Sequence, residues 1–131
     1  MNRKRALQAS YFLLRVVPGW MFFQVGTIKL FGWFGGMGNT AMPFMSQLWI
    51  GGVLETFGGA LIILGLFTRP VAFILSGEMA VAYWQFHAPH GAWPILNRGE
   101  PAVLFCFIFL FMAAQGAGDW SLDALVGRKR G

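Results

Sequence analysis

The chain has 131 residues and a formal net charge of +5, and it is 56% hydrophobic but only 11% charged. A soluble domain usually carries about 25% charged residues, and at this size roughly 30% of the unfolded chain's surface stays exposed after folding. Ten basic and five acidic residues are too few to cover such a surface. The composition excludes a disordered chain, a nucleic-acid-binding domain and an ordinary soluble enzyme, and it predicts one integral membrane domain over residues 1–131.

The first predicted membrane span covers about residues 10–31 and follows the basic stretch Arg3-Lys4-Arg5. This start resembles the n-region of a signal peptide, but no small-x-small cleavage site follows a short apolar core. Arg15 also interrupts the segment. We therefore expect an uncleaved membrane anchor, with a bend or local loosening of the helix at Pro18.

Three further spans are predicted at about residues 47–67, 70–87 and 101–117, because a helix needs about 20 mostly apolar residues to cross the hydrocarbon core. A linker rich in glycine, aromatic residues and methionine, residues 32–46, precedes the second span, and an aromatic loop, residues 88–100, precedes the fourth. Ser121 is expected to cap a short interfacial helix that runs to Val126. The sequence thus predicts an all-α fold, a four-helix transmembrane bundle.

The distribution of basic residues predicts the topology. Both chain ends are basic, and Arg69 is the charged residue of the tight turn after the second span. Lysine and arginine favour the cytoplasmic side of a membrane. An even number of spans then places both termini and this turn in the cytoplasm, with the lipid bilayer around the helices.

Four charged residues lie within the predicted spans, Arg15, Lys29, Glu55 and Glu78. A charge at the middle of a bilayer costs about 2.5–3.5 kcal/mol even on the mild insertion scale, so each should face the bundle interior and have a partner. Depth along the helices predicts the pairs Arg15–Glu78 and Lys29–Glu55, with Glu100 as another partner for Lys29. Such charges either hold the helices in register or line a polar pocket for a head group, a quinone or a proton path.

Glycines accompany these charges on the same helical faces. Successive residues of a helix are rotated by about 100°, so residues three or four positions apart share a face. In the first span one such stripe consists of Arg15, Gly19, Phe22, Gly26 and Lys29. In the second span a similar stripe consists of Gly51, Glu55, Gly58 and Ile62, with Gly52 and Gly59 beside it. Small residues allow membrane helices to approach closely. The stripes therefore predict close helix packing beside the charged residues.

Both histidines lie close together, His87 at the end of the third span and His90 in the loop that follows it. Their spacing suits a metal on a regular helix, but Pro89 between them argues against that geometry, and no metal site is expected. The other interpretation is that the two histidines lie as a pair at the membrane–water interface. Cys106 is the single cysteine, so it is interpreted as a small apolar filler, and redox chemistry would require a bound cofactor or partner.

Several motifs together resemble the DoxX family of small bacterial membrane proteins. From residue 15 to residue 123 they are Arg15 with Gly26-x-x-Lys29, Glu55-x-x-Gly58-Gly59, Leu64-Gly65-Leu66-x-Thr68-Arg69-Pro70, Gly77-Glu78-Met79-Ala80-x-Ala82-Tyr83, His87-Ala88-Pro89, Trp93-Pro94-Ile95, Asn97-x-Gly99-Glu100 and Gly116-x-Gly118-x-x-Ser121-Leu122-Asp123. Two positions depart from the family pattern. Arg98 stands where the family often has glycine, which offers Glu100 a local partner, and Ala117 stands where it often has proline.

The resemblance implies a multi-pass, four-helix protein of the bacterial inner membrane. Some members of the family are linked to quinone-dependent oxidoreductases, notably the small subunits of thiosulfate:quinone oxidoreductase. The chain is therefore expected to be a membrane subunit of a quinone-linked oxidoreductase system, acting with other membrane or redox subunits.

In this hypothesis an outer quinone pocket is lined by Lys29, Glu55, His87, Asn97 and Glu100, while Arg15 and Glu78 form a structural ion pair in the inner half. The alternative is a non-catalytic accessory or assembly subunit, whose glycine stripes and aromatic faces bind other membrane subunits. A small transporter or channel is a third possibility, and it would require oligomerisation.

Overall fold

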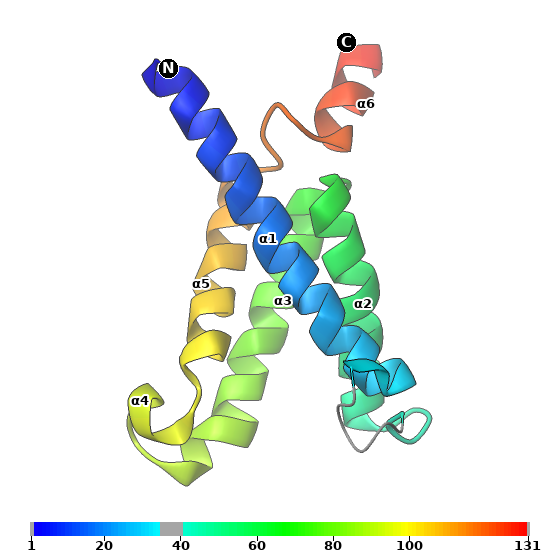
Figure 1. Ribbon diagram of the computed structural model, residues 1–131, viewed down its shortest axis with the longest axis vertical. Coiled ribbons are helices and arrows are strands. Elements are labelled where there is room, and N and C mark those ends of the chain that lie inside the picture. The colour runs from blue at the N-terminus through cyan, green and yellow to red at the C-terminus, as the bar shows by residue number, and fades with distance from the viewer. Residues whose placement is uncertain (1, 35–40, 131) are drawn as a thin grey trace. The chain divides into compact units, whose positions relative to one another are not determined.

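The computed structural model describes residues 2–34 and 41–130, the last three by their backbone. Part of the predicted linker, residues 35–40, lies outside the described residues. Within the described ranges all regular secondary structure is helical (Figure 1), in agreement with the all-α prediction. The helices are α1 (Arg3–Phe31), α2 (Gln47–Leu64), α3 (Thr68–Ala82), η2 (Tyr83–His87), η3 (Ala88–His90), α4 (Pro94–Asn97), α5 (Glu100–Gln115) and α6 (Leu122–Arg130).

Helix α1 is longer than the predicted first span. Its first turn is capped by Asn2, whose side-chain oxygen accepts a hydrogen bond from the backbone N–H of Arg5 at 2.8 Å. It continues through Pro18 and ends at Gly32, which has a φ of 69° and donates its N–H to Ile28. The 29 residues of α1 span about 43 Å at 1.5 Å per residue, which exceeds the roughly 30 Å of a hydrocarbon core.

The turn between α2 and α3 is set by backbone conformation. Helix α2 ends at Leu64, earlier than the predicted residue 67, because Gly65 and Phe67 adopt positive φ angles of 69° and 53°. Glycine adopts this conformation without steric cost. Helix α3 then begins at Thr68, so Pro70 lies in its first turn, where a missing N–H leaves no intrahelical bond unmade.

Glycines bring α1 and α2 into backbone contact. A Cβ atom at Gly59 would lie 2.8 Å from the carbonyl oxygen of Gly19, and one at Gly26 would collide with the backbone nitrogen of Thr56. Real Cβ atoms do not approach backbone atoms this closely, so a larger residue would push the helices apart. The glycine stripes of the two helices therefore produce the close packing that the sequence predicted, with Gly52 and Gly59 as the contacts on α2.

The described residues form two compact units, one of residues 1–68 and 117–131 and one of residues 69–116. The first contains α1, α2 and α6. In the second, α3 and α5 are joined by a hydrogen bond of 2.7 Å from Ser76 Oγ to the carbonyl oxygen of Cys106. Within each unit, apolar side chains lie both between helices and on the outside.

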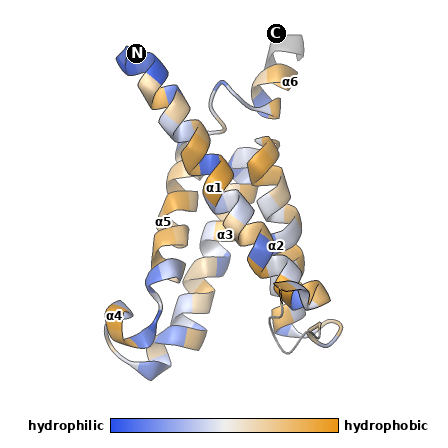
Figure 2. Cartoon of the chain, viewed as in Figure 1, coloured by the Kyte–Doolittle hydropathy of each residue, from blue (hydrophilic) through white to orange (hydrophobic). Residues whose placement is uncertain are grey.

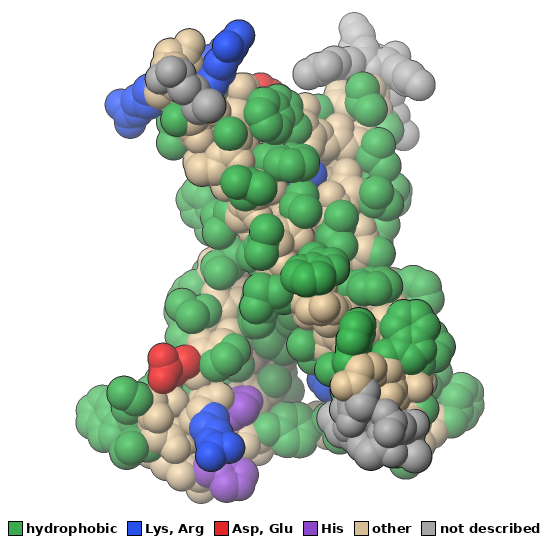
Figure 3. Space-filling model, viewed as in Figure 1, with side chains coloured by type: hydrophobic (Ala, Val, Ile, Leu, Met, Phe, Trp, Pro, Cys, Tyr) green, Lys and Arg blue, Asp and Glu red, His purple; other side chains and the backbone are tan. Residues whose placement is uncertain are grey.

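Two helices, α1 and α2, are long and apolar enough to cross a membrane, and α5 is apolar but shorter. Figure 2 shows hydrophobic residues along most of α5, and Figure 3 shows hydrophobic side chains over much of the visible face. Trp20 on α1, Phe57 on α2 and Phe107 on α5 are each more than half exposed. Large apolar side chains on the outside of these three helices are typical of a lipid-facing surface.

Candidate functional site

An ion pair connects the last turn of α1 with the middle of α2. Lys29 Nζ lies 2.7 Å from Glu55 Oε1, and the two side chains are 17% and 1% exposed. Gly52 makes room for this pair, because a Cβ atom there would lie 2.9 Å from Cβ of Lys29. The structure thus contains the Lys29–Glu55 pair that depth and spacing predicted.

The pair has two chemical capacities. As a neutral unit, it lets a lysine and a glutamate be buried between membrane helices at lower cost than either charge alone. Its ammonium group also carries donors beyond the one that faces Glu55, since a lysine has three N–H bonds. An acceptor such as a carbonyl oxygen can bind there, and the neighbouring carboxylate can accept or supply a proton.

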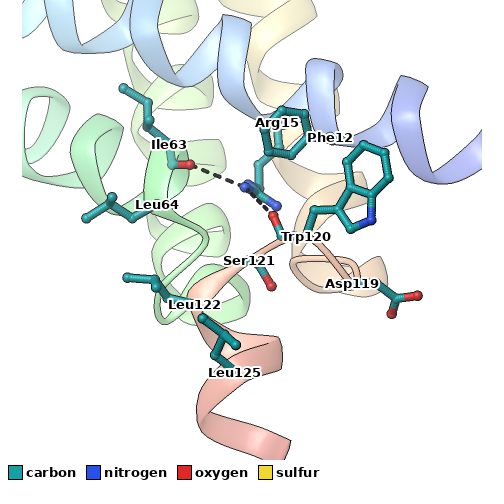
Figure 4. Close-up of a pocket in the computed structure, with 9 residues that line it drawn as sticks. All are labelled: Phe12, Arg15, Ile63, Leu64, Asp119, Trp120, Ser121, Leu122 and Leu125. Carbon is teal, nitrogen blue, oxygen red and sulfur yellow. Dashed lines mark hydrogen bonds between the residues drawn. The ribbon is translucent and has the colours of Figure 1, made fainter.

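Arg15 is 1% exposed and donates to backbone carbonyls (Figure 4). On the α2 side, Nε donates to Ile62 at 2.9 Å and Nη2 to Ile63 at 3.3 Å. On the side of the segment after α5, Nη1 donates to Ala117 at 2.7 Å and Nη2 to Trp120 at 3.0 Å. The last carbonyls of a helix lack intrahelical partners and carry partial negative charge. The guanidinium therefore stabilises the end of α2 and holds the chain after α5 against it.

The predicted Arg15–Glu78 pair joins residues of the two separate units, so it stays a prediction. Glu78 is half-buried on α3. The sequence predicted a carboxylate as the partner of Arg15 and did not predict the four backbone carbonyls that accept its hydrogen bonds. Backbone acceptors are present at every residue, so the sequence pattern carries no signal for which of them an arginine will meet.

Asp123 forms a second link between the end of the chain and the α2–α3 turn. Its carboxylate accepts hydrogen bonds from the backbone N–H groups of Phe67 at 2.8 Å and Thr68 at 3.0 Å. Its own N–H donates to the carbonyl of Gly65 at 2.9 Å. Asp123 thus caps the first turn of α3, a role that sequence reasoning did not assign. The sequence signal that could have suggested this contact was the presence of both the Leu64-Gly65-Leu66-x-Thr68-Arg69-Pro70 motif of the turn and the Ser121-Leu122-Asp123 motif.

Ser121 caps the start of α6, as predicted. Its Oγ accepts a hydrogen bond from the N–H of Ala124 at 3.2 Å and donates to the carbonyl of Gly118 at 2.7 Å. The helix continues beyond the predicted end at Val126, as far as Arg130.

A pocket of about 430 Å³ lies beside Arg15, between α1, the end of α2 and the start of α6 (Figure 4). Its walls are mostly apolar. The lining residues are Phe12, Arg15, Ile63, Leu64, Asp119, Trp120, Ser121, Leu122 and Leu125. A pocket of this kind, with few polar groups in an apolar wall, suits the binding of a small amphipathic molecule.

In the second unit, Asn97 organises the loop between α3 and α5. It is 4% exposed. Its Nδ2 donates to the Tyr83 hydroxyl at 3.2 Å and to the carbonyl of Gly91 at 3.0 Å, and its Oδ1 accepts from the N–H of Gly99 at 2.8 Å. These bonds satisfy most of the donors and acceptors of the Asn97 side-chain amide, so Asn97 stabilises the conformation of the loop.

His87 lies at the end of η2, a π-helical turn. Its Nδ1 is 3.1 Å from the carbonyl oxygen of Asn97, and its ring stacks on Tyr83 with centroids 6.4 Å apart. Turns of this type are frequent at functional sites. Glu100 is exposed at the start of α5.

The structure therefore brings together two subsets of the predicted outer pocket. Lys29 contacts Glu55 in the first unit, and His87 contacts Asn97 in the second. Because the subsets belong to different units, their assembly into one pocket with Glu100 stays a prediction.

The family model for DoxX matches residues 10–88. This chain belongs to the DoxX family, and it is a membrane protein of that family. The matched range contains Arg15, the Lys29–Glu55 pair, Glu78 and His87.

Two proteins of Haemophilus influenzae, each named "uncharacterized protein", are similar to this DoxX chain. One is 43% identical over a match of 122 residues, and the match covers 86% of this chain and 89% of the relative. The other is 30% identical over a match of 126 residues, and the match covers 89% of this chain and 83% of the relative. No solved structure matches the chain.

Proposed function

We propose that this DoxX chain is a membrane subunit of a quinone-linked oxidoreductase system. The buried Lys29–Glu55 pair carries the proposal, because it places an ammonium donor beside a carboxylate within an apolar helix pair. A bound quinone supplies two-electron, two-proton redox chemistry, and a partner redox subunit supplies or accepts the electrons. Links between some family members and quinone-dependent enzymes support the same assignment.

The residues present fit a quinone head group. The Lys29 side chain is 17% exposed, so part of it is accessible to a ligand while Glu55 remains buried. In the proposal Lys29 donates a hydrogen bond to the ligand's oxygen, Glu55 exchanges a proton with solvent through Lys29, and His87, Asn97 and Glu100 complete the outer pocket.

We further propose a four-helix bundle in the bacterial inner membrane with both termini in the cytoplasm. Helices α1 and α2 supply two spans. Helix α3 and η2 follow each other from Thr68 to His87, a path of about 30 Å at 1.5 Å per residue, and α5 supplies the fourth. A tag at the C-terminus should be inaccessible from outside sealed cells, and labelling of that tag by an impermeant reagent would refute this orientation.

The functional test is turnover with a soluble quinone analogue in membranes that contain the partner subunits. Glu55→Gln should lower turnover about tenfold or more, since general acid–base groups contribute about 10²–10⁴-fold. Lys29→Gln together with Glu55→Gln should recover folding but not turnover. The exposed Asp119→Asn is the control and should leave turnover unchanged. Full turnover in the double variant would overturn the proposal.

The alternative, an accessory or assembly subunit, is favoured by a different observation. Arg15 meets four carbonyls and Lys29 meets Glu55, so these charges are satisfied within the chain, as in a structural scaffold. Purification from native membranes decides between the two. A stoichiometric large complex with no quinone on this chain would support the scaffold role.

A further inference from the structure

The pocket beside Arg15 is separate from the Lys29–Glu55 pair and has no role in the proposed function. Arg15 precedes Lys29 by 14 positions on α1, which corresponds to about 21 Å along the helix axis. The two sites therefore lie well apart along α1, and the pocket requires its own explanation.

The walls of this pocket match a hydrocarbon chain. Six of its nine lining residues are apolar or aromatic, among them Ile63, Leu64 and Leu125. Leu64 and Leu125 are both 50% exposed, so the pocket opens to the outside of the first unit. Its volume of about 430 Å³ falls in the range of about 300–1,000 Å³ that is typical of small-molecule sites.

Its place along α1 corresponds to a membrane boundary. Because α1 exceeds the hydrocarbon thickness by about 13 Å, roughly nine of its residues extend beyond the core. If the C-terminal end of α1 lies at one boundary, residues 3–11 extend past the other, and Phe12 and Arg15 lie just inside it. A ligand there would have its acyl part in hydrocarbon and its polar part among the head groups.

The two chain segments that lead to the pocket are rich in basic residues. Arg3, Lys4 and Arg5 are exposed at the start of α1, and Arg128, Lys129 and Arg130 follow Leu125 within the same helix α6. The carboxylate of Asp123 is engaged by two backbone N–H groups, and that of Asp119 accepts a hydrogen bond from Gln8. Basic clusters of this size beside a membrane helix attract anionic lipids.

We propose that the pocket between α1, the end of α2 and α6 binds one anionic phospholipid of the cytoplasmic leaflet. One acyl chain packs against Leu64 and Leu125, and the basic residues of the two chain ends attract the negatively charged phosphate. The proposal rests on the membrane orientation proposed above, but it does not depend on quinone chemistry.

The test measures the lipid retained by the full chain. The protein is reconstituted into vesicles of equal parts phosphatidylglycerol and phosphatidylcholine, extracted in mild detergent and examined by native mass spectrometry. The wild-type chain should retain one phosphatidylglycerol. Leu125→Trp fills the pocket and should lower the retained fraction about tenfold, the loss expected for about two fewer buried methylenes. Val126→Trp adds the same ring at a neighbouring position outside the lining, and it should retain lipid as the wild type does.

A second variant, Arg128→Gln/Lys129→Gln/Arg130→Gln, leaves the pocket wall unchanged. It should lose the preference for phosphatidylglycerol over phosphatidylcholine by about tenfold or more. Equal retention by Leu125→Trp and Val126→Trp, equal binding of the two lipids by the wild type, or an unchanged preference in the triple variant would each overturn the proposal. Normal lipid retention by Glu55→Gln, whatever its turnover, separates this result from the quinone proposal.

Discussion

Lys29 and Glu55 join α1 to α2 through a contact of 2.7 Å between Nζ and Oε1. Removing one partner of a buried pair leaves the other charge uncompensated and costs about 3–5 kcal/mol. Lys29→Met and Glu55→Gln should each lower stability by an amount of this order, and the double variant should lose less than either one. Unfolding in mixed micelles with increasing denaturing detergent measures the difference, with Lys4→Met as the exposed control. Equal losses in the two single variants and the double variant would contradict the coupling.

Arg15 should not be replaceable by lysine. Its planar guanidinium reaches four carbonyls in two segments, whereas an ammonium group is compact and cannot span them. Arg15→Lys should therefore lower the stability of the first unit by about 3 kcal/mol or more, because several carbonyls lose a charged donor. The thermal unfolding midpoint checks this, with Arg5→Lys as a matched control at an exposed position. A midpoint equal to that of the wild type would show that charge alone is sufficient.

The glycine contacts predict opposite effects of the same substitution at two positions. Gly26→Ala places a methyl group against the backbone of Thr56, whereas a Cβ at Gly77 has nothing within 4 Å. Gly26→Ala should cost about 1–3 kcal/mol, the usual effect of overpacking. Gly77→Ala should be neutral or stabilise α3 by about 0.5–1 kcal/mol, since alanine is the better helix former. Comparable effects at the two positions in the same detergent titration would argue against close α1–α2 packing.

Asp123 should protect two specific amides. Asp123→Ala removes the acceptor for the N–H groups of Phe67 and Thr68, and loss of a helix cap costs about 0.5–2 kcal/mol. Hydrogen–deuterium exchange should accelerate at these two amides and little elsewhere in α3. Asp119→Ala is the control, because Asp119 bonds with a side chain and not with the α2–α3 turn. Unchanged exchange at residue 68 would rule out the cap.

The sequence predicted those features that depend on local spacing. Depth along the helices predicted the Lys29–Glu55 pair, with Glu100 as another partner, and the serine before a helical segment predicted Ser121 as a cap. Helix ends were predicted less well where a positive φ angle decided them. Phe67 at 53° is such a case, because bulky residues rarely adopt this conformation.

Features that depend on distant backbone groups could not be predicted. Arg15 meets carbonyls more than 100 positions away, at Ala117 and Trp120, and Asp123 meets amides 55 and 56 positions earlier. Every residue carries these groups, so only the folded path of the chain selects among them. The π-helical turn that ends at His87 was also missed, since a single additional residue in a turn leaves the apolar pattern nearly unchanged.

The backbone contact between Gly19 and Gly59 has a consequence for biosynthesis. Glu55 is synthesised 26 residues after Lys29, so α1 leaves the ribosome with its lysine unmatched. A lone charge is costly in hydrocarbon, and the glycines let the second helix pack directly on the first. The order of synthesis therefore favours entry of the two helices into the bilayer together, as a hairpin in which Lys29 and Glu55 are already paired.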